Sequence, residues 1–256
     1  MKRNRLLTVL LSLAGFLWIT TLPARAWSGN DATIAADRAD RAAEALKDLA
    51  TSPNRGISTE VLEKAQGIAV IPHVVNAGLV FGGSWGKGLL SVREKSGAWS
   101  APVFITLTGG SLGPQIGAEA TDVVLIFNNR QGIDALLNSK LKLGADASVA
   151  IGPVGGTAGA GTDLDLKSAV YSYSRANGLF AGIALDGAVI SVDRHTDRGI
   201  YGPGLSARDI LFRQKVPARW MTSPFTNALD LYSPYINKSA EAPNAHHNMG
   251  AMMPSS

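Results

Sequence analysis

The stretch "GGSWG" places Ser84 in the spacing of a hydrolase nucleophile. In α/β-hydrolases this G-x-S-x-G pattern puts the serine on a strained turn between a strand and a helix, followed along the chain by an acid and then a histidine. Either Asp186 or Asp193, followed by His195, keeps that order. However, the next residues, "KGLLSVREK", alternate like a strand, and the same spacing recurs in "GGSLG" around Ser111. We therefore expect both serines to be turn residues, with a serine hydrolase using Ser84 as the weakest alternative.

Phosphate and metal sites have little support in the sequence. The glycine-rich loop 152–161 lacks the full phosphate-binding patterns, so its glycines are expected to permit positive φ angles or close approach between strands. Asp163 and Asp165 could face one way on a strand, but the other oxygen ligands of a calcium loop are missing. No histidine cluster has the spacing of a zinc site. A loose copper or nickel site remains as a hypothesis for five residues of the tail: His246, His247, Met249, Met252 and Met253. We expect no cofactor.

A tryptophan and several cations near the glycine stretches suit a lipid surface. An aromatic ring fits the interfacial region of a membrane, and lysine attracts anionic phosphate groups. The alternative is that these cations are ordinary solvated charges of loops. The candidate lipid-binding residues are Trp85, Lys87, Arg93, Lys95, Lys140 and Lys142.

The start of the chain has the pattern of a secretory signal peptide. Basic residues precede an apolar stretch over 6–19, and Ala24-Arg25-Ala26 fits the small-x-small cleavage rule. We expect cleavage near Ala26 and a mature chain that is periplasmic or secreted, with the inner face of the outer membrane as one location. All four charges of the removed segment are basic, so the net charge of +4 falls to zero, which argues against a nucleic-acid partner.

The composition also narrows the chemistry and the domain count. The chain has no cysteine, which excludes disulfides, thiolate metal sites, a cysteine nucleophile and a lipid-modified cysteine anchor. No linker divides the remaining residues, so one domain over 27–237 is expected. The tail 238–256 is poor in large aliphatic residues and is expected to be disordered.

The periodicity changes from helical to strand-like along the chain. Apolar residues at helical spacing predict an amphipathic helix over 31–50, and a second helix begins at Ser58 or Thr59 and runs to Gln66. After Gly67 the apolar runs are short, rich in β-branched residues and separated by glycine, which predicts many strands, with "VVLIF" in the centre of a sheet. Further short helices are expected over 130–140 and from Ser206.

Three motifs, in this order, resemble one known family. They are "GGSLGPQIGAEATD", "KLGADASVAIGPVG" and "SYSRANGLFAGIALDGA", within a likeness that covers about 31–212. This pattern resembles the SYLF domain family, which is related to the eukaryotic Las17-binding actin-regulator domain. The resemblance implies an α+β fold, with N-terminal helices packed on a strongly curved, mostly antiparallel sheet that forms a partial barrel. It also implies a non-enzymatic domain that associates with phospholipid, including phosphatidylinositol lipids in eukaryotic members.

The sequence thus predicts a phospholipid-binding domain at the membrane surface in the periplasm. Actin is not expected as a partner in that compartment, and the lipid class and the oligomeric state stay open. The alternatives are an integral outer-membrane β-barrel or a structural envelope protein. A membrane barrel needs strands of about 9 to 11 residues, whereas the expected strands are shorter and are interrupted by helices.

Overall fold

The computed structural model describes residues 29–52, 56–78, 82–110, 117–153, 168–176, 179–180, 185–213, 216 and 220–235. The predicted signal peptide and tail lie outside these residues. So do Ser111, the pair Asp163 and Asp165, the five metal-binding candidates of the tail, and the glycine-rich loop beyond Pro153.

Six helices occur in the described part of the chain. They are α1 (Gly29–Thr51), α2 (Thr59–Lys64), α3 (Gln131–Asn138), α4 (Arg194–Tyr201), α5 (Ala207–Phe212) and α6 (Ser223–Tyr232). The four helices predicted from the sequence are confirmed as α1, α2, α3 and α5. Ser206 caps α5 in a capping box, because its hydroxyl accepts from the Asp209 N–H while the Asp209 carboxylate accepts from the Ser206 N–H.

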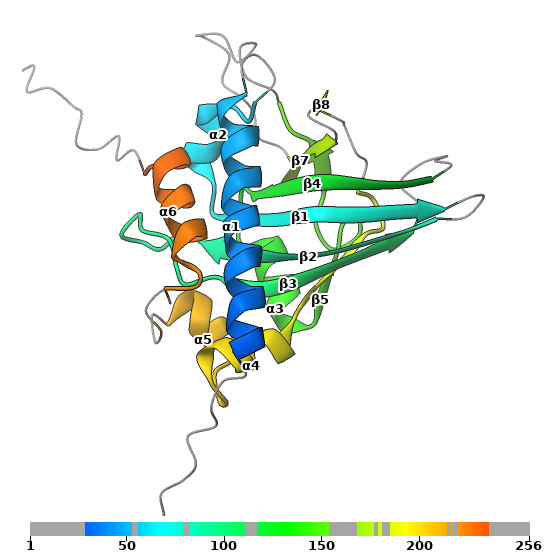
Figure 1. Cartoon of the computed structure of the whole chain (residues 1–256). Coiled ribbons are helices and arrows are strands. Elements are labelled where there is room, and N and C mark those ends of the chain that lie inside the picture. The colour runs from blue at the N-terminus through cyan, green and yellow to red at the C-terminus, as the bar shows by residue number, and fades with distance from the viewer. Residues whose placement is uncertain are drawn as a thin grey trace, which may run out of the picture.

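The strands form one sheet that curls strongly (Figure 1). Eight strands follow the order β5-β9-β3-β2-β1-β4-β7-β6, and β8 pairs with β7. Every pairing is antiparallel except β6 with β7, which confirms the predicted α+β class and the mostly antiparallel sheet. The strands are β1 (Gly67–Gly78), β2 (Gly82–Val92), β3 (Val103–Gly110), β4 (Gly117–Phe127), β5 (Lys140–Lys142), β6 (Val149–Ile151), β7 (Val170–Ala176), β8 (Leu179–Phe180) and β9 (Val189–Val192).

The sheet has two different faces. Helix α1 packs across one face, which we call the outer face, with Ala35, Ala39 and Leu46 of its apolar stripe fully buried. Helix α3 lies against the inner face, where Gly67 and Phe127 contact it. The "VVLIF" segment of β4 is buried on both faces, as its composition predicts. Strands β1 to β4 continue past the helices as a projecting end of the sheet (Figure 1).

A bulge divides β1 into two halves. Its register against both β2 and β4 shifts between Val70 and Val75, so β1 contains one extra residue there. His73 has a positive φ of 52° at this point, and its backbone N–H donates to Oδ1 of Asp122 at 2.9 Å. The bulge bends β1 and so changes the direction of the half that projects beyond the helices.

Two expectations about local structure are wrong. Ser84 is not a turn residue, because "GGSWG" lies inside β2. Three strands are also longer than expected, since β1, β2 and β4 have 12, 11 and 11 residues. Glycine is required at Gly88 of β2 because the neighbouring strand crowds this position: a Cβ there would lie 2.2 Å from the Val70 carbonyl oxygen. Helices α4 and α6 were not predicted, and His195 lies in α4.

The first glycine of the glycine-rich loop packs against a tyrosine side chain. A Cβ on Gly152 would lie 2.1 Å from Cζ of Tyr173, so the tyrosine ring occupies the space that any larger residue would need. Burial raises the pKa of the Tyr173 hydroxyl, so it stays protonated and donates to the Pro153 carbonyl oxygen at 3.2 Å.

Candidate functional site

The projecting end of the sheet carries an exposed row of side chains on its outer face. Residues that pair across antiparallel strands share one face of the sheet. Val75 of β1 is opposite Trp85 of β2, and their side chains are 42% and 50% exposed. On one side, Val75 pairs with Ala120 of β4. On the other side, Trp85 pairs with Thr108 of β3, Thr108 with Val189 of β9, and Val189 with Lys142 of β5. Val75 and Trp85 therefore form an exposed apolar pair, and Lys142 lies at the end of this row of paired residues.

The next row of the same face begins with Lys87. Lys87 pairs with Thr106, Thr106 with Ser191, and Ser191 with Lys140. Because neighbouring strands are about 4.8 Å apart, three strand spacings place Trp85 and Lys142 roughly 14 Å apart along the sheet. The structure thus brings four of the six predicted residues to one face: Trp85, Lys87, Lys140 and Lys142. We call this set, together with Val75, the outer-face patch.

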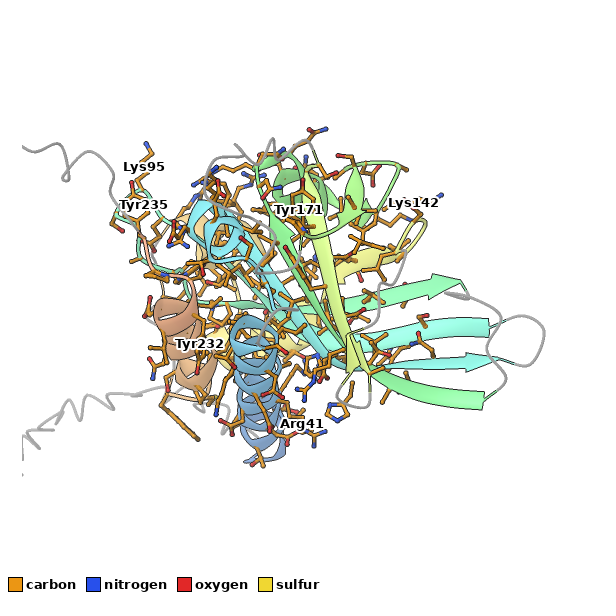
Figure 2. The ribbon with its side chains drawn as sticks, turned by 90° about the horizontal axis from the view of Figure 1, so that it is seen from above. Arg41, Lys95, Lys142, Tyr171, Tyr232 and Tyr235 are labelled. Atoms are coloured by element: carbon orange, nitrogen blue, oxygen red, sulfur yellow. The ribbon has the colours of Figure 1, made fainter. Side chains whose placement is uncertain are left out.

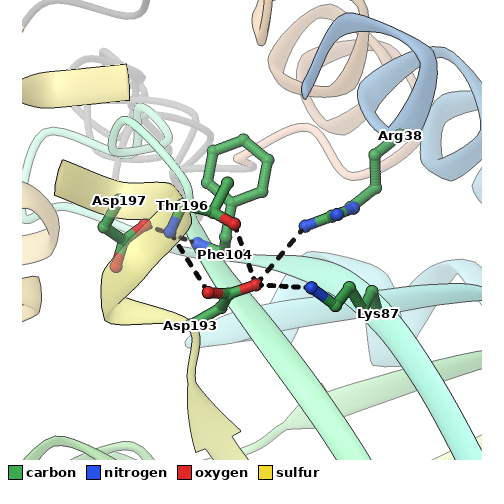
Figure 3. A network of polar contacts seen from close by, with 6 residues as sticks. All are labelled: Arg38, Lys87, Phe104, Asp193, Thr196 and Asp197. Carbon is green, nitrogen blue, oxygen red and sulfur yellow. Dashed lines mark hydrogen bonds and ion pairs between the residues drawn. The ribbon is translucent and has the colours of Figure 1, made fainter. Parts of the chain in front are cut away.

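Lys87 is held by an ionic network under α1 (Figure 3). Its Nζ lies 3.1 Å from Oδ2 of Asp193 and 5.9 Å from the Trp85 ring centroid. Asp193 also caps α4 by accepting from the Thr196 N–H, and Arg38 of α1 lies 4.0 Å from the same Oδ2. Burial by itself would raise the pKa of Asp193, but the hydrogen bonds from Thr196 and Lys87 outweigh it and lower the pKa.

A second carboxylate lies deeper in this network. Asp197 is 4% exposed and accepts the Phe104 N–H at 2.8 Å, while its Oδ2 has no hydrogen-bond partner among the described residues. Burial raises the pKa of Asp197 to about 7, and the neighbouring Asp193 adds to this effect while Arg38 opposes it. Burial likewise lowers the pKa of Arg38, whose guanidinium lies 5.3 Å from the Phe104 ring centroid. The network joins α1 and α4 to Lys87 of β2 and Phe104 of β3.

The two lysines of β5 differ from Lys87 in their surroundings. Lys140 and Lys142 are exposed, and neither has a carboxylate within 4 Å among the residues that the structure describes. Their ammonium groups are thus available to an external anion, whereas Lys87 has an internal counterion.

Arg93 and Lys95 lie elsewhere. Arg93 is eight positions after Trp85 along the chain, which corresponds to about 26 Å in an extended strand. Figure 2 shows Lys95 beside Tyr235 at one end of the molecule and Lys142 far from both. The six predicted residues therefore form two separate groups and not one site.

Sequence reasoning missed three residues at or beside the outer-face patch. Val75 was not predicted because the bulge breaks the alternation of "HVVNAG". Arg38 and Asp193 were not predicted as partners of Lys87, because they come from distant parts of the chain.

The geometry of a serine hydrolase is absent at Ser84. Its side chain is 4% exposed on the opposite face from Trp85, and its hydroxyl donates to Asn76 Oδ1 at 2.7 Å. Its continuous strand also lacks the required strand-to-helix turn. Asp193 is committed to Lys87 and Thr196, while His195 is exposed on α4.

Within the described ranges, no three histidine or carboxylate side chains gather closely enough to hold a metal ion. None of the helices in the part that the structure describes is long and apolar enough to cross a membrane.

Comparison with known proteins identifies the family. Residues 108–232 match the model of the family Ysc84, described as Las17-binding protein actin regulator. Protein YSC84 of Saccharomyces cerevisiae is 38% identical over 161 residues, covering 61% of this chain and 34% of the yeast protein. SH3 domain-containing YSC84-like protein 1 of Xenopus laevis is 36% identical over 179 residues, covering 67% of this chain and 53% of the frog protein.

A third relative, LAS seventeen-binding protein 3 of Saccharomyces cerevisiae, is 36% identical over 158 residues, covering 60% of this chain and 34% of the yeast protein. The chain thus spans about a third to a half of these relatives. It carries a domain of the Ysc84 family, which is the SYLF family that the sequence motifs indicate.

Proposed function

We propose that this chain is a non-enzymatic domain that binds phospholipid at a membrane surface, in the periplasm or outside the cell after loss of its signal peptide. The observation that supports this most directly is the outer-face patch. Trp85 and Val75 expose apolar surface side by side on the part of the sheet that projects beyond the helices. A tryptophan there suits the interfacial region of a bilayer, where its ring meets apolar chains and headgroups together.

Charge supports the same orientation. Lys140 and Lys142 lie on the same face as Trp85 and have no internal counterion within 4 Å among the described residues. A lysine near an anionic membrane contributes about 1 kcal/mol of attraction, which salt screens within a Debye length of about 10 Å. The Trp85 side chain would supply the apolar contribution and the two lysines a preference for anionic lipid.

The names of the relatives suggest other partners for those proteins. The name of one yeast relative says that it binds LAS seventeen, and the family description adds actin regulation. We propose no actin partner for this chain, because the expected export would separate it from cytoskeletal proteins.

Sedimentation with vesicles tests the proposal. The wild type, Trp85→Ala and Trp220→Ala would be incubated with phosphatidylcholine vesicles containing about 30% phosphatidylglycerol. Trp220 is 72% exposed and lies next to α6, away from the patch, so it is a matched control. Half of a tryptophan surface, about 125 Å², transfers with a free energy of at most about 3 kcal/mol. We expect at least tenfold weaker binding for Trp85→Ala and unchanged binding for Trp220→Ala.

Charge variants give an independent readout. Lys140→Gln combined with Lys142→Gln should weaken binding to anionic vesicles and leave binding to pure phosphatidylcholine unchanged. Lys47→Gln, an exposed lysine of α1, serves as the control. Absence of wild-type binding to every vesicle, or equal binding by Trp85→Ala, would overturn the proposed function.

A further inference from the structure

A cavity of about 570 Å³ opens at the end of the molecule opposite the outer-face patch. It lies between the turn that follows β2, the beginning of α3, and α5. Its lining includes four cationic side chains, namely Arg93, Lys95, Arg130 and Arg208, and two carboxylates, Glu94 and Asp134. The lining therefore has an excess of two positive charges.

Arg93 contributes a buried charge without a direct counterion. The residue is 4% exposed, and its side chain donates to uncharged acceptors among the described residues: the carbonyl oxygens of Leu62, Ala65, Gly97 and Ser233, and the Ser233 hydroxyl. Burial lowers the pKa of Arg93, and Asp230 acts on it only as a more distant charge. The guanidinium also stacks 4.3 Å from the Trp99 ring centroid. The wall of the cavity is thus permanently positive, and no described carboxylate contacts this cation.

Arg130 and Arg208 are arranged around one aromatic ring. Their guanidinium carbons lie 4.8 Å and 5.9 Å from the Phe212 ring centroid, so the two groups are within about 11 Å of each other. Stacking on a ring orients a guanidinium without using its N–H donors. Arg208 pairs with Asp134 at 3.3 Å, but Arg130 has no carboxylate within 4 Å among the residues described here.

The free donors suit a phosphate group. Arg130 makes one long hydrogen bond, of 3.5 Å, to the Arg93 carbonyl oxygen, and the exposed Lys95 has no partner among the described side chains. A guanidinium fork binds two phosphate oxygens together, and a lysine adds a point charge. A phosphate monoester carries close to two negative charges at neutral pH, which matches the charge excess of the lining.

From this arrangement we propose that the cavity binds a phosphate monoester, with Arg130 and Lys95 as direct ligands, Arg208 beside them, and Arg93 as a buried electrostatic support. The volume is within the range of small-molecule sites, which admits a phosphorylated metabolite or the headgroup of a lipid that ends in a phosphate monoester. The site is separate from the outer-face patch and needs no membrane contact by Trp85.

Calorimetric titration with glycerol 3-phosphate and with inorganic phosphate tests the site in solution. We expect the wild-type chain to bind glycerol 3-phosphate, and Arg130→Gln to weaken this binding at least tenfold. Arg41→Gln, an exposed arginine of α1 in a surface ion pair with Asp37, is the control and should bind like the wild type. Arg130 is exposed, so its replacement should leave the unfolding midpoint unchanged, which a thermal melt checks.

A second arm separates the two sources of the phosphate. Vesicles with phosphatidic acid would be compared with vesicles of equal charge made with phosphatidylglycerol, a diester, using the wild type, Arg130→Gln and Trp85→Ala. If glycerol 3-phosphate or inorganic phosphate binds and this binding depends on Arg130, the result supports a soluble ligand. A preference for phosphatidic acid that depends on Arg130 supports a headgroup.

Binding of neither phosphate source, or binding that Arg130→Gln leaves unchanged, would overturn the inference. Equal displacement of the probe by chloride at the same ionic strength would overturn it as well. Trp85→Ala separates this inference from the proposed function. The variant should bind the soluble probes like the wild type, because they do not require the outer-face patch, and it should bind vesicles more weakly.

Discussion

Replacing Asp197 by asparagine should remove a pH-dependent loss of stability from the protein. Asparagine has nearly the same shape, and its side-chain oxygen can still accept the Phe104 N–H that Asp197 accepts at 2.8 Å. The variant cannot ionise, so it no longer places a charge next to Asp193 in a buried network. The substitution therefore isolates one titration with little change in packing.

The sign of the effect follows from the direction of the pKa shift. Burial raises the pKa of Asp197 in the folded protein to about 7, above its ordinary value of 3.8. Between these values the folded protein binds the proton and the unfolded chain does not. The contribution of Asp197 to the free energy of unfolding therefore falls as pH rises from about 4 to 7 and is constant above 7.

The size of the effect can be worked out from the same two values. Between pH 5.5 and pH 8.5, linkage of the two protonation equilibria lowers the free energy of unfolding of the wild type by about 2 kcal/mol relative to that of Asp197→Asn. For a chain of this size that corresponds to a difference of roughly 4–8 °C in unfolding midpoint. Asp40→Asn replaces an exposed carboxylate of α1, the helix that carries Arg38 of the network. The unfolding midpoint of this control should depend on pH in the same way as that of the wild type.

Thermal melts followed by circular dichroism at pH 5.5, 7 and 8.5 provide the assay. The difference in midpoint between Asp197→Asn and the wild type should widen with pH in favour of the variant. If the two proteins lose stability in parallel over this range, Asp197 is ionised in both folded and unfolded states, and the reasoning from burial is refuted.

Two further predictions concern β2. Gly88→Ala should cost about 3 kcal/mol in stability, because the new Cβ would meet the Val70 carbonyl oxygen, whereas Gly83→Ala in the same strand should change stability by less than about 0.5 kcal/mol. Urea unfolding of both variants checks this, and equal midpoints would contradict the close approach. Ser84→Ala should cost about 1–3 kcal/mol by leaving Asn76 Oδ1 without its buried donor. Any ester turnover by the purified protein should be unaffected by this change, and its loss would restore the hydrolase hypothesis.

The elements that were predictable have local signals. Helix α1 is visible as a stripe of alanine and leucine at helical spacing, α5 as a serine cap followed by an acidic residue, and the centre of the sheet as the unbroken apolar run of β4. Each of these signals lies within a short stretch of chain. The stripe of α1 and the apolar run of β4 report burial, and the cap of α5 reports the start of a helix. The resemblance to the family then supplied the architecture that local patterns leave open.

The elements that were not predictable depend on contacts between distant segments. Glycines in β2 suggest a turn when read locally, yet Gly88 is required because β1 crowds this position. Helix α4 begins at an aspartate whose partners come from α1 and β2.

The candidate site was predictable in residue types but not in grouping. Strand register places Trp85 with Lys140 and Lys142, while the length of β2 takes Arg93 and Lys95 to the far end of the molecule. Arg130, Arg208 and Phe212 gave no signal, because surface arginines are common and only the folded chain stacks them on one ring.

The extra residue in β1 has a consequence for how this family member can vary. Two residues of β1, Pro72 and His73, stand opposite the single residue Asp122 of β4. Because side chains alternate between the two faces of a strand, deleting one of these two residues would restore regular alternation, so Val75 would stay on the outer face and Asn76 would still face Ser84. The deletion would instead remove the bend of β1 and the hydrogen bond from the His73 N–H to Asp122. The number of residues at the bulge therefore sets the direction of the projecting half of the strand and leaves the choice of side chains on each face unchanged.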